Sequence, residues 1–399
     1  MDRHTGQKRA WVALAVSAAA FLIYGFGSGL RANYGVMLES IAERSGVDYA
    51  SVSFALSVGQ LTVGIVQPLF GALALKKSNS FVLAVGAMLI AGGLLGTPFC
   101  RSAFSLTILV GIILSGGTGA MAFGIVMAAI TPVLGEKKAA VVSGFVSASS
   151  GVVGTILAPV MSFLIVRLGL QGMMLALCVP TALIFLISVT MGREEDTRQF
   201  GTMKESLSVP GTIRDAMADP SYRAVFLAFG TCGYYMCIIE THLFSQYKSY
   251  GFSDSLVAAA MSVYGIGAMA GCILTGFLDS IFPNRFVLAG TYWSRILIAL
   301  SLIFLPKSLL QVMATAFLLG CSGNATVPPT SGLITKRFGS RKLGILFGTA
   351  FLFHQIGAFF SGWLGGVLLE KTGTYDLIWI SSMVLSLLAG LLVVRVKDN

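Results

Sequence analysis

Long apolar stretches separated by short polar clusters run through the whole chain. Twelve of them are long enough to cross about 30 Å of hydrocarbon as an α-helix that rises roughly 1.5 Å per residue. Their expected limits are 11–37, 50–74, 80–99, 104–131, 138–166, 171–191, 222–246, 254–279, 285–305, 308–334, 342–369 and 375–396. The pattern therefore predicts an all-α membrane protein with twelve transmembrane helices.

The chain also repeats itself at an offset of about 205 residues. The hexapeptide Asn79–Ala84 returns with one substitution as Asn284–Ala289. Two apolar halves related in this way are typical of transporters built from internal repeats. Glycines with nearly the same spacing are Gly46 and Gly251, Gly135 and Gly339, and Gly169 and Gly373.

The longest polar stretch lies between the two copies. We expect an N-terminal six-helix half at residues 1–191, a cytoplasmic linker at 192–221 and a pseudo-symmetric C-terminal six-helix half at 222–399. Within the linker, residues 212–218 are expected to form a short amphipathic helix, with a disordered tether as the alternative.

The composition agrees with a chain surrounded by the lipid bilayer. Of its 399 residues, 55% are hydrophobic and 11% are charged, and the mean hydropathy is +0.84. A soluble domain has about 25% charged residues. The net charge of +10 does not require nucleic acid as a partner, because most of the 27 Lys and Arg residues fall on one side of the expected helices. That bias predicts a multi-pass protein of the plasma membrane, the inner membrane of a bacterium, with both termini in the cytoplasm.

No pattern of residues indicates an enzyme or a cofactor. There is no Gly-rich phosphate loop ending in Lys-Ser or Lys-Thr, so transport would be secondary and not driven by ATP. The histidines His4, His242 and His354 are dispersed, and the six cysteines lack metal-ligand spacing. We therefore expect no catalytic residue, no metal and no cofactor, in a carrier that works as a monomer.

Two six-helix halves joined by a central loop resemble the major facilitator superfamily over essentially the whole chain. That family carries a Gly, an Asp and basic residues between spans two and three, often repeated between spans eight and nine. Here Gly276–Asp279 followed by Arg285 keeps the pattern, whereas Gly71–Lys77 has lost its acid. The resemblance implies that Asp279 and Arg285 form a gate or a structural pair, with the carboxylate binding the guanidinium.

Within the superfamily, the chain is similar to the monocarboxylate and oxalate-type carboxylate transporters, including their bacterial members. Monocarboxylate carriers have a cation in the outer half of span one, where this chain has Arg31. They also have an Asp and an Arg in span eight for proton and carboxylate handling, but Ala268 and Cys272 stand there instead, so that coupling chemistry does not carry over. The similar segments are Gly29–Val36, Ser51–Ala55, Thr241–Leu243, Pro328–Leu333 and Phe353–Phe359.

Ionisable residues inside the spans are the candidate functional groups, because a charge at bilayer depth costs at least about 2.5 kcal/mol. Arg31 can hold a carboxylate with two parallel hydrogen bonds and stays charged at any relevant pH. Tyr34 is its expected companion in a substrate site. The alternative is a structural ion pair between Arg31 and Glu240, because spans one and seven are related by the repeat.

Glu240 and His242 are the candidates for proton coupling. Two residues apart on a helix, they point about 200° apart, so only one can face a central cavity. Either group could titrate there, and the alternative for each is the outer interface, in water. The remaining candidates are His354, Gln355 and Asn324 for the substrate site, and Arg295 for a structural pair or for hydrogen bonds to helix carbonyls.

These residues lead to an expected function. It is a secondary active transporter that moves a small organic anion, most simply a monocarboxylate, together with a proton by alternating access. The alternatives are an exchanger of carboxylates or other anions, a drug/proton antiporter, and a membrane receptor that binds its ligand without transporting it. Arg31 disfavours the cationic cargo of a drug exporter.

Overall fold

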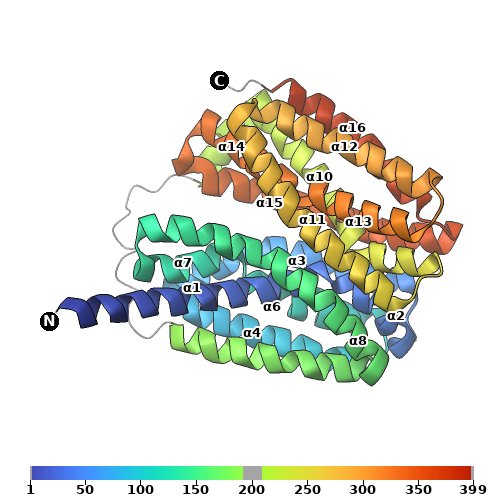
Figure 1. The fold of residues 1–399 in the computed structure, drawn as a ribbon, viewed down its shortest axis with the longest axis horizontal. Coiled ribbons are helices and arrows are strands. Elements are labelled where there is room, and N and C mark those ends of the chain that lie inside the picture. The colour runs from blue at the N-terminus through green and yellow to red at the C-terminus, as the bar shows by residue number, and fades with distance from the viewer. Residues whose placement is uncertain (1, 192–208, 397–399) are drawn as a thin grey trace.

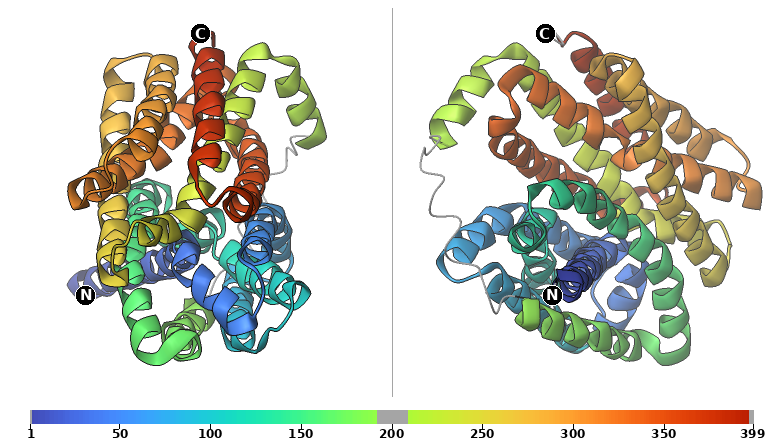
Figure 2. Two further views of the ribbon diagram at one scale, coloured as in Figure 1. Left: turned by 90° about the vertical axis from the view of Figure 1, so that its right-hand side faces the viewer. Right: turned by 60° about the vertical axis from the view of Figure 1, so that its left-hand side comes forward.

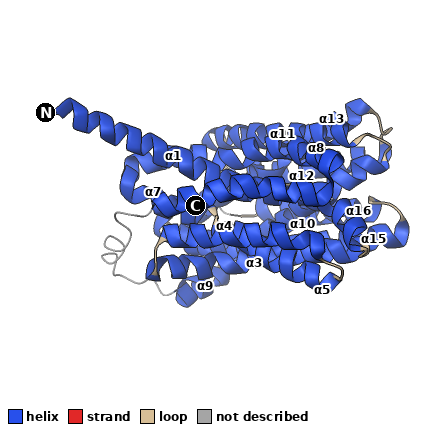
Figure 3. Ribbon diagram, turned by 90° about the horizontal axis from the view of Figure 1, so that it is seen from below, coloured by secondary structure: helices blue, strands red, loops and turns tan. Residues whose placement is uncertain are grey.

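The computed structural model describes residues 2–191 and 209–396, which form helices and no strand (Figure 3). The α-helices are α1 (Asp2–Ala32), α2 (Tyr34–Ser45), α3 (Tyr49–Lys76), α4 (Asn79–Gly96), α5 (Ala103–Leu106), α6 (Ser115–Ala120), α7 (Phe123–Leu134), α8 (Glu136–Met191), α9 (Val209–Ala218), α10 (Pro220–Ser249), α11 (Asp254–Ile281), α12 (Asn284–Phe304), α13 (Leu309–Gly323), α14 (Val327–Phe338), α15 (Ser340–Thr372) and α16 (Asp376–Val394). The short 3-10 helices are η1 (Thr97–Phe99) and η4 (Asn324–Thr326), and η2 (Thr107–Leu114) is a π-helix.

Eleven helical stretches of the described chain are long and apolar enough to cross a membrane. One of them, Phe145–Thr190, has 46 residues, which corresponds to about 69 Å of helix, twice the need of a single crossing. The chain reverses direction at Gly169, whose φ of 67° and ψ of 178° are not helical. Counted as two crossings, this stretch gives the twelve spans that the hydropathy pattern predicts.

The repeat is visible in the backbone geometry. Each of the six described residues with positive φ is a glycine, and they form the three pairs found in the sequence. Gly46 and Gly251 have φ of 72° and 89°, Gly135 and Gly339 of 74° and 80°, and Gly169 and Gly373 of 67° and 71°. The last pair differs in ψ, which is 178° at Gly169 and 2° at Gly373. A residue with a Cβ rarely adopts a positive φ, which reverses or ends a helix. The two copies therefore turn at equivalent places.

Three spans are interrupted near their middle. Span one breaks at Asn33, whose Nδ2 donates hydrogen bonds to the carbonyl oxygens of Gly29 and Gly154 at 2.8 and 3.1 Å. Span four breaks after α6, and span ten breaks at η4, at equivalent places in the repeat. The expected single helix at 11–37 is therefore two helices. Such breaks are tolerated at membrane depth where protein groups satisfy the freed backbone.

The helices before and after the linker form two groups that face each other, α1 to α8 and α10 to α16 (Figures 1 and 2). An even number of spans puts both chain ends on one side, which we call the terminal side; the other is the opposite side. Helix α3 runs along α15, and α8 runs along α11. Where α8 runs along α11, a Cβ on Gly265 of α11 would collide with Thr155 of α8, so glycine permits the close approach of these two helices.

On the opposite side, ionic contacts join the two groups. Lys248 Nζ at the end of α10 lies 2.7 Å from a carboxylate oxygen of Glu39 in α2 and 3.1 Å from one of Asp254 in α11. The Glu370 carboxylate at the end of α15 accepts a hydrogen bond of 2.8 Å from the backbone N–H of Ala50 at the start of α3. These contacts hold the two groups together on this side.

Aromatic residues add a second contact on the opposite side. The Tyr49 hydroxyl, at the start of α3, lies 3.0 Å from His242 Nδ1 in α10 and 3.2 Å from the hydroxyl of Tyr375, which precedes α16. His242 Nε2 lies 2.8 Å from the carbonyl oxygen of Gly362. We refer to the ionic and aromatic groups together as the opposite-side contacts.

On the terminal side, helix α9 confirms the short amphipathic helix expected in the linker. It packs on α10 and α15, with Thr212 and Ala216 buried and Arg214 exposed. After it, Asp219 caps the first turn of α10 by accepting hydrogen bonds from the N–H groups of Ser221 and Tyr222. Linker residues 192–208 lie outside the described part of the chain.

Candidate functional site

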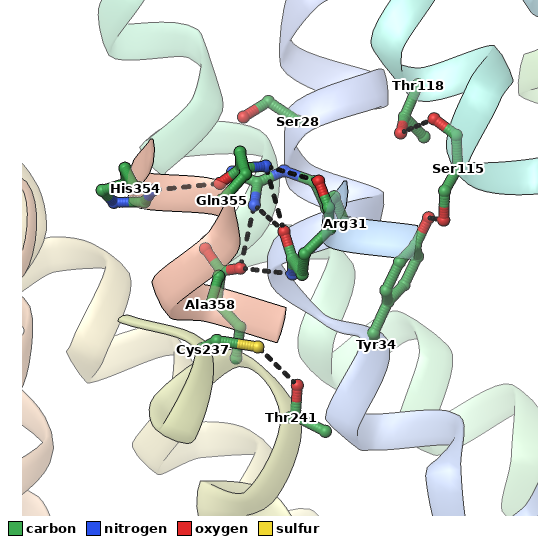
Figure 4. A network of polar contacts seen from close by, with 12 residues as sticks. Ser28, Arg31, Tyr34, Ser115, Thr118, Cys237, Thr241, His354, Gln355 and Ala358 are labelled. Atoms are coloured by element: carbon green, nitrogen blue, oxygen red, sulfur yellow. Dashed lines mark hydrogen bonds and ion pairs between the residues drawn. The ribbon is translucent and has the colours of Figure 1, made fainter. Parts of the chain in front are cut away.

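Arg31 lies in the last turn of α1, next to the break at Asn33, and its guanidinium points between the two groups of helices (Figure 4). Its Nη1 donates to Gln60 Oε1 at 2.8 Å and to Glu240 Oε2 at 3.0 Å. Gln60 comes from α3 and Glu240 from α10. The structure therefore brings together two predicted residues from the two copies of the repeat.

Two glutamines extend this contact into a network. Gln60 Nε2 donates to the same Glu240 oxygen at 3.2 Å, and Gln355 Nε2 of α15 donates to the Gln60 carbonyl oxygen at 3.0 Å. His354 Nδ1 lies 2.9 Å from Gln355 Oε1. Gln60 is thus the central member, although the sequence marks it only as a polar residue in an apolar span. We call Arg31, Gln60, Glu240, Gln355 and His354 the central network.

The central pair is shielded from water but not sealed. The Glu240 side chain is 5% exposed, whereas the Arg31 side chain keeps 19% of its surface exposed. Burying two charges is costly unless each has a partner, and here each charge has the other. A carboxylate ligand at the guanidinium would compete with Glu240 for the same donor.

His242 points away from the central network, as the 200° separation from Glu240 predicts. It is fully buried, and both of its ring nitrogens have partners among the opposite-side contacts. Glu240 is 4% exposed as a residue. Neither residue therefore lies in water, although His242 does lie toward the opposite side.

Tyr34 and Asn324 make no hydrogen bond with the described residues of the central network. The Tyr34 hydroxyl lies 3.1 Å from Ser115 Oγ of span four. The Tyr34 side chain is nevertheless close enough to Arg31 and Glu240 to interact with both electrostatically. Asn324 is exposed at the start of η4, and its side chain makes no hydrogen bond with the described residues.

Arg295 makes the carbonyl contacts expected of a structural residue. It is 1% exposed, and its Nη2 donates to the carbonyl oxygens of Ser322 and Gly323 at 2.8 and 3.1 Å. These carbonyls lie where α13 ends and η4 begins. The guanidinium also lies 4.2 and 4.9 Å from the ring centroids of Tyr235 and Tyr292. Aromatic faces stabilise a buried cation in this geometry.

The expected ion pair between Asp279 and Arg285 does not form in the described part of the chain. Arg285 Nη1 instead donates to the Val396 carbonyl oxygen at 3.1 Å, and its guanidinium lies 4.7 Å from the Phe286 ring centroid. Arg285 is in the first turn of α12 and points toward the end of α16, whereas Asp279 is in the last turn of α11. Asp279 and Arg285 are therefore close in sequence, but their side chains do not meet.

The fold and the central network define a class of protein: a membrane transporter made of two related six-span groups with a central polar site between them. Residues 17–310 and 249–399 match the sequence model of the family described as the Major Facilitator Superfamily. The chain belongs to that superfamily, as the sequence resemblance predicts.

Individual proteins similar to the chain agree with this assignment. The uncharacterized MFS-type transporter YcxA of Bacillus subtilis (strain 168) is 22% identical over 358 residues, which cover 88% of this chain and 87% of that protein. Monocarboxylate transporter 13 of Rattus norvegicus is 23% identical over 371 residues, covering 90% and 83%. A crystal structure of a mutant of the nucleoside transporter NupG has a TM-score of 0.79 at 15% identity, covering 95% of this chain and 98% of that one. The predicted fold is therefore confirmed.

Proposed function

We propose that the protein carries a small organic anion, a monocarboxylate, across the membrane in symport with a proton. The observation that carries this proposal is the ion pair between Arg31 and Glu240, shared with Gln60. A guanidinium is the side chain best suited to a carboxylate. In this structure the Arg31 guanidinium already binds a carboxylate, that of Glu240. The similarity to a monocarboxylate transporter is distant but consistent with this substrate class.

Glu240 is the proton carrier in this proposal. Protonation removes the charge that holds Arg31, so the guanidinium becomes free to bind the substrate carboxylate. The substrate then takes the place of Glu240 on Nη1, and His354 and Gln355 complete the site from the second half, with Tyr34 and Asn324 as additional members. When the substrate leaves on the other side, Arg31 recovers Glu240 as the proton is released. His242 is less suited to this role, because its partners lie among the opposite-side contacts.

Alternating access requires the two halves to move as bodies. We assign residues 1–191 and 222–399 to these bodies and 192–221 to the cytoplasmic tether between them. The opposite-side contacts would be the outer gate, closed in this structure. The terminal side would be the cytoplasmic side of a plasma membrane, the inner membrane in a bacterium. The distribution of Lys and Arg residues supports this orientation.

The test is uptake of labelled lactate, pyruvate and benzoate into proteoliposomes. We expect an imposed acid-outside gradient to accelerate uptake by the unmodified protein. Glu240→Gln should abolish that acceleration but retain exchange of external for internal anion. Glu43→Gln, which changes an exposed acid of α2, is the matched control and should behave like the unmodified protein. Uptake that requires internal anion and ignores the pH gradient would identify an exchanger and contradict symport.

A further inference from the structure

Helix α15 has two packed flanks. On one flank, Leu352 and Gln355 lie against Gly64 of α3. On the other, Phe353 lies against Gly230 of α10. Between the two flanks, the outer face of α15 carries Ile356, which is 36% exposed. At about 100° per residue, these contacts fix which face of α15 points into the interior.

The interior face of α15 carries an aromatic stripe on the terminal side of the central network. Phe347, Phe351 and His354 lie at spacings of four and three residues, opposite the exposed outer face. Phe347 and Phe351 are only half-buried, although they are turned inward. Phe351 stacks on His354 with centroids 5.4 Å apart and planes at 9°, and Phe229 of α10 lies 5.0 Å from His354. The stripe ends at His354, which precedes Gln355 in the chain and contacts its side chain.

The first half presents aromatic residues at the same side of the network. Tyr24 is seven residues before Arg31, two turns nearer the terminal side on the same face of α1. Its ring meets that of Phe123 edge to face, with centroids 5.6 Å apart. Gly25 and Gly29 turn toward Val153 of α8, which leaves the Tyr24 and Arg31 face directed inward. Both halves therefore place aromatic rings on the terminal side of the central network.

We propose that the carried anion is an aromatic monocarboxylate, with its carboxylate on Arg31 and its ring on the terminal side against Phe351. This inference rests on the proposed function and specifies its substrate class. Phe351 is four residues from Gln355, about 6 Å along the helix axis. A ring one or two bonds from a carboxylate spans a similar length. Aromatic rings bind one another edge to face or offset, with a preference beyond simple area burial.

The test compares phenylacetate with acetate by calorimetry on the purified full-length protein. The two acids share the carboxylate and differ by the ring. We expect phenylacetate to bind at least about tenfold more tightly, because burying a phenyl group is favourable on that scale. Phe351→Ala should weaken phenylacetate binding about three- to tenfold and leave acetate binding unchanged. Phe360→Ala, the same change at an exposed position of α15, is the control and should alter neither.

Phe351→Leu keeps the apolar volume and removes the ring, so it decides the question if Phe351→Ala does not fold. A ratio of the two affinities that is unchanged in the folded Phe351 variants would overturn the inference. Equal affinity of the unmodified protein for phenylacetate and acetate would also overturn it, while the proposed carboxylate site would stand. Failure of both acids to bind would instead count against the proposed function.

Discussion

Arg31 and Glu240 lie 209 positions apart in the chain, one in each copy of the repeat, and their side chains meet at 3.0 Å. Gln60 binds both partners from a third helix. The sequence interpretations treated anion binding and an internal ion pair as alternatives for Arg31. In the proposed mechanism the two roles are compatible, because the Glu240 carboxylate can occupy the Arg31 guanidinium until protonation neutralises it and a substrate carboxylate takes its place.

Arg31→Gln should greatly weaken anion binding. It removes the charge-assisted hydrogen bonds, each worth about 1.5–3 kcal/mol, so we expect affinity to fall by roughly ten- to a hundredfold or more. Arg44→Gln makes the same chemical change at an exposed position on α2 and should leave affinity unchanged. Calorimetric titration with a panel of monocarboxylates measures both. Unaltered affinity for every acid in Arg31→Gln would remove this residue from the site.

Breaking the pair from one side should cost more stability than removing both charges. Arg31→Gln leaves the Glu240 carboxylate buried without its cation, at a cost of about 3 kcal/mol. In the double variant with Glu240→Gln, two neutral amides face each other and most of that loss should return. Thermal unfolding of the four proteins in detergent gives the coupling. Strictly additive losses would show that the two charges do not interact.

Tyr49→Phe should loosen the opposite-side contacts. It removes the hydroxyl that meets His242 and Tyr375 and leaves a buried ring nitrogen without this partner. We expect a loss of about 1–3 kcal/mol. The measurement uses a protein in which Cys237 is the single cysteine and a membrane-impermeant thiol reagent applied from the opposite side. In this background, Tyr49→Phe should raise the rate at which Cys237 reacts. Tyr234→Phe is the control, because its hydroxyl meets Ser381 within the second half; equal reaction rates in both would exclude a gating role for Tyr49.

Arg295→Lys should destabilise the protein even though it keeps the charge. An ammonium cannot reproduce the fork that reaches the carbonyl oxygens of Ser322 and Gly323, and leaving a buried acceptor unsatisfied costs about 1–3 kcal/mol. Arg167→Lys, at an exposed position, should change the unfolding temperature very little. Equal unfolding temperatures for the two variants would argue against a structural role for Arg295.

The Asp219 carboxylate should give a pH-dependent contribution to stability. Burial alone would raise its pKa, but the Arg337 Nε at 2.6 Å and the N–H groups of Ser221 and Tyr222 outweigh burial, so the pKa lies below its ordinary value. A depressed folded-state pKa stabilises above the unfolded value of about 3.9 and is lost as the pH falls through the folded value. Asp219→Asn retains a good helix cap, so its loss of about 1 kcal/mol at pH 7 should disappear as the pH falls through the depressed pKa of the folded state. A difference that persists at low pH would attribute the effect to the cap and not to the charge.

Hydropathy and the repeat were sufficient to predict the number of spans and the places where the chain turns. Gly46 and Gly251 illustrate the reason: each glycine meets a requirement of its own backbone, a positive φ, that depends on no distant residue. The break at Asn33 was not predicted, because its support comes partly from Gly154 in another span. Local sequence carries no record of that partner.

The central site was predicted in part. Arg31, Glu240, His354 and Gln355 were recognised because charge or polarity inside a span is costly and therefore conspicuous. Gln60 was not selected, since a neutral amide gives a weak signal until its partners are known. The placement of Tyr34 in the substrate site stays a prediction, because its hydroxyl meets Ser115. Arg285 was paired with Asp279 from a motif, but it binds the Val396 carbonyl oxygen instead.

The balance of charge at Arg31 and Glu240 has a consequence for the electrical behaviour of the proposed carrier. Empty, the pair sums to zero; loaded, a protonated Glu240, Arg31 and a carboxylate also sum to zero. Both reorientation steps would then move no net charge, so the membrane potential, worth about 2.3 kcal/mol per charge per 100 mV, would neither drive nor oppose them. Accumulation would be limited by the proton concentration ratio alone, about tenfold for each pH unit.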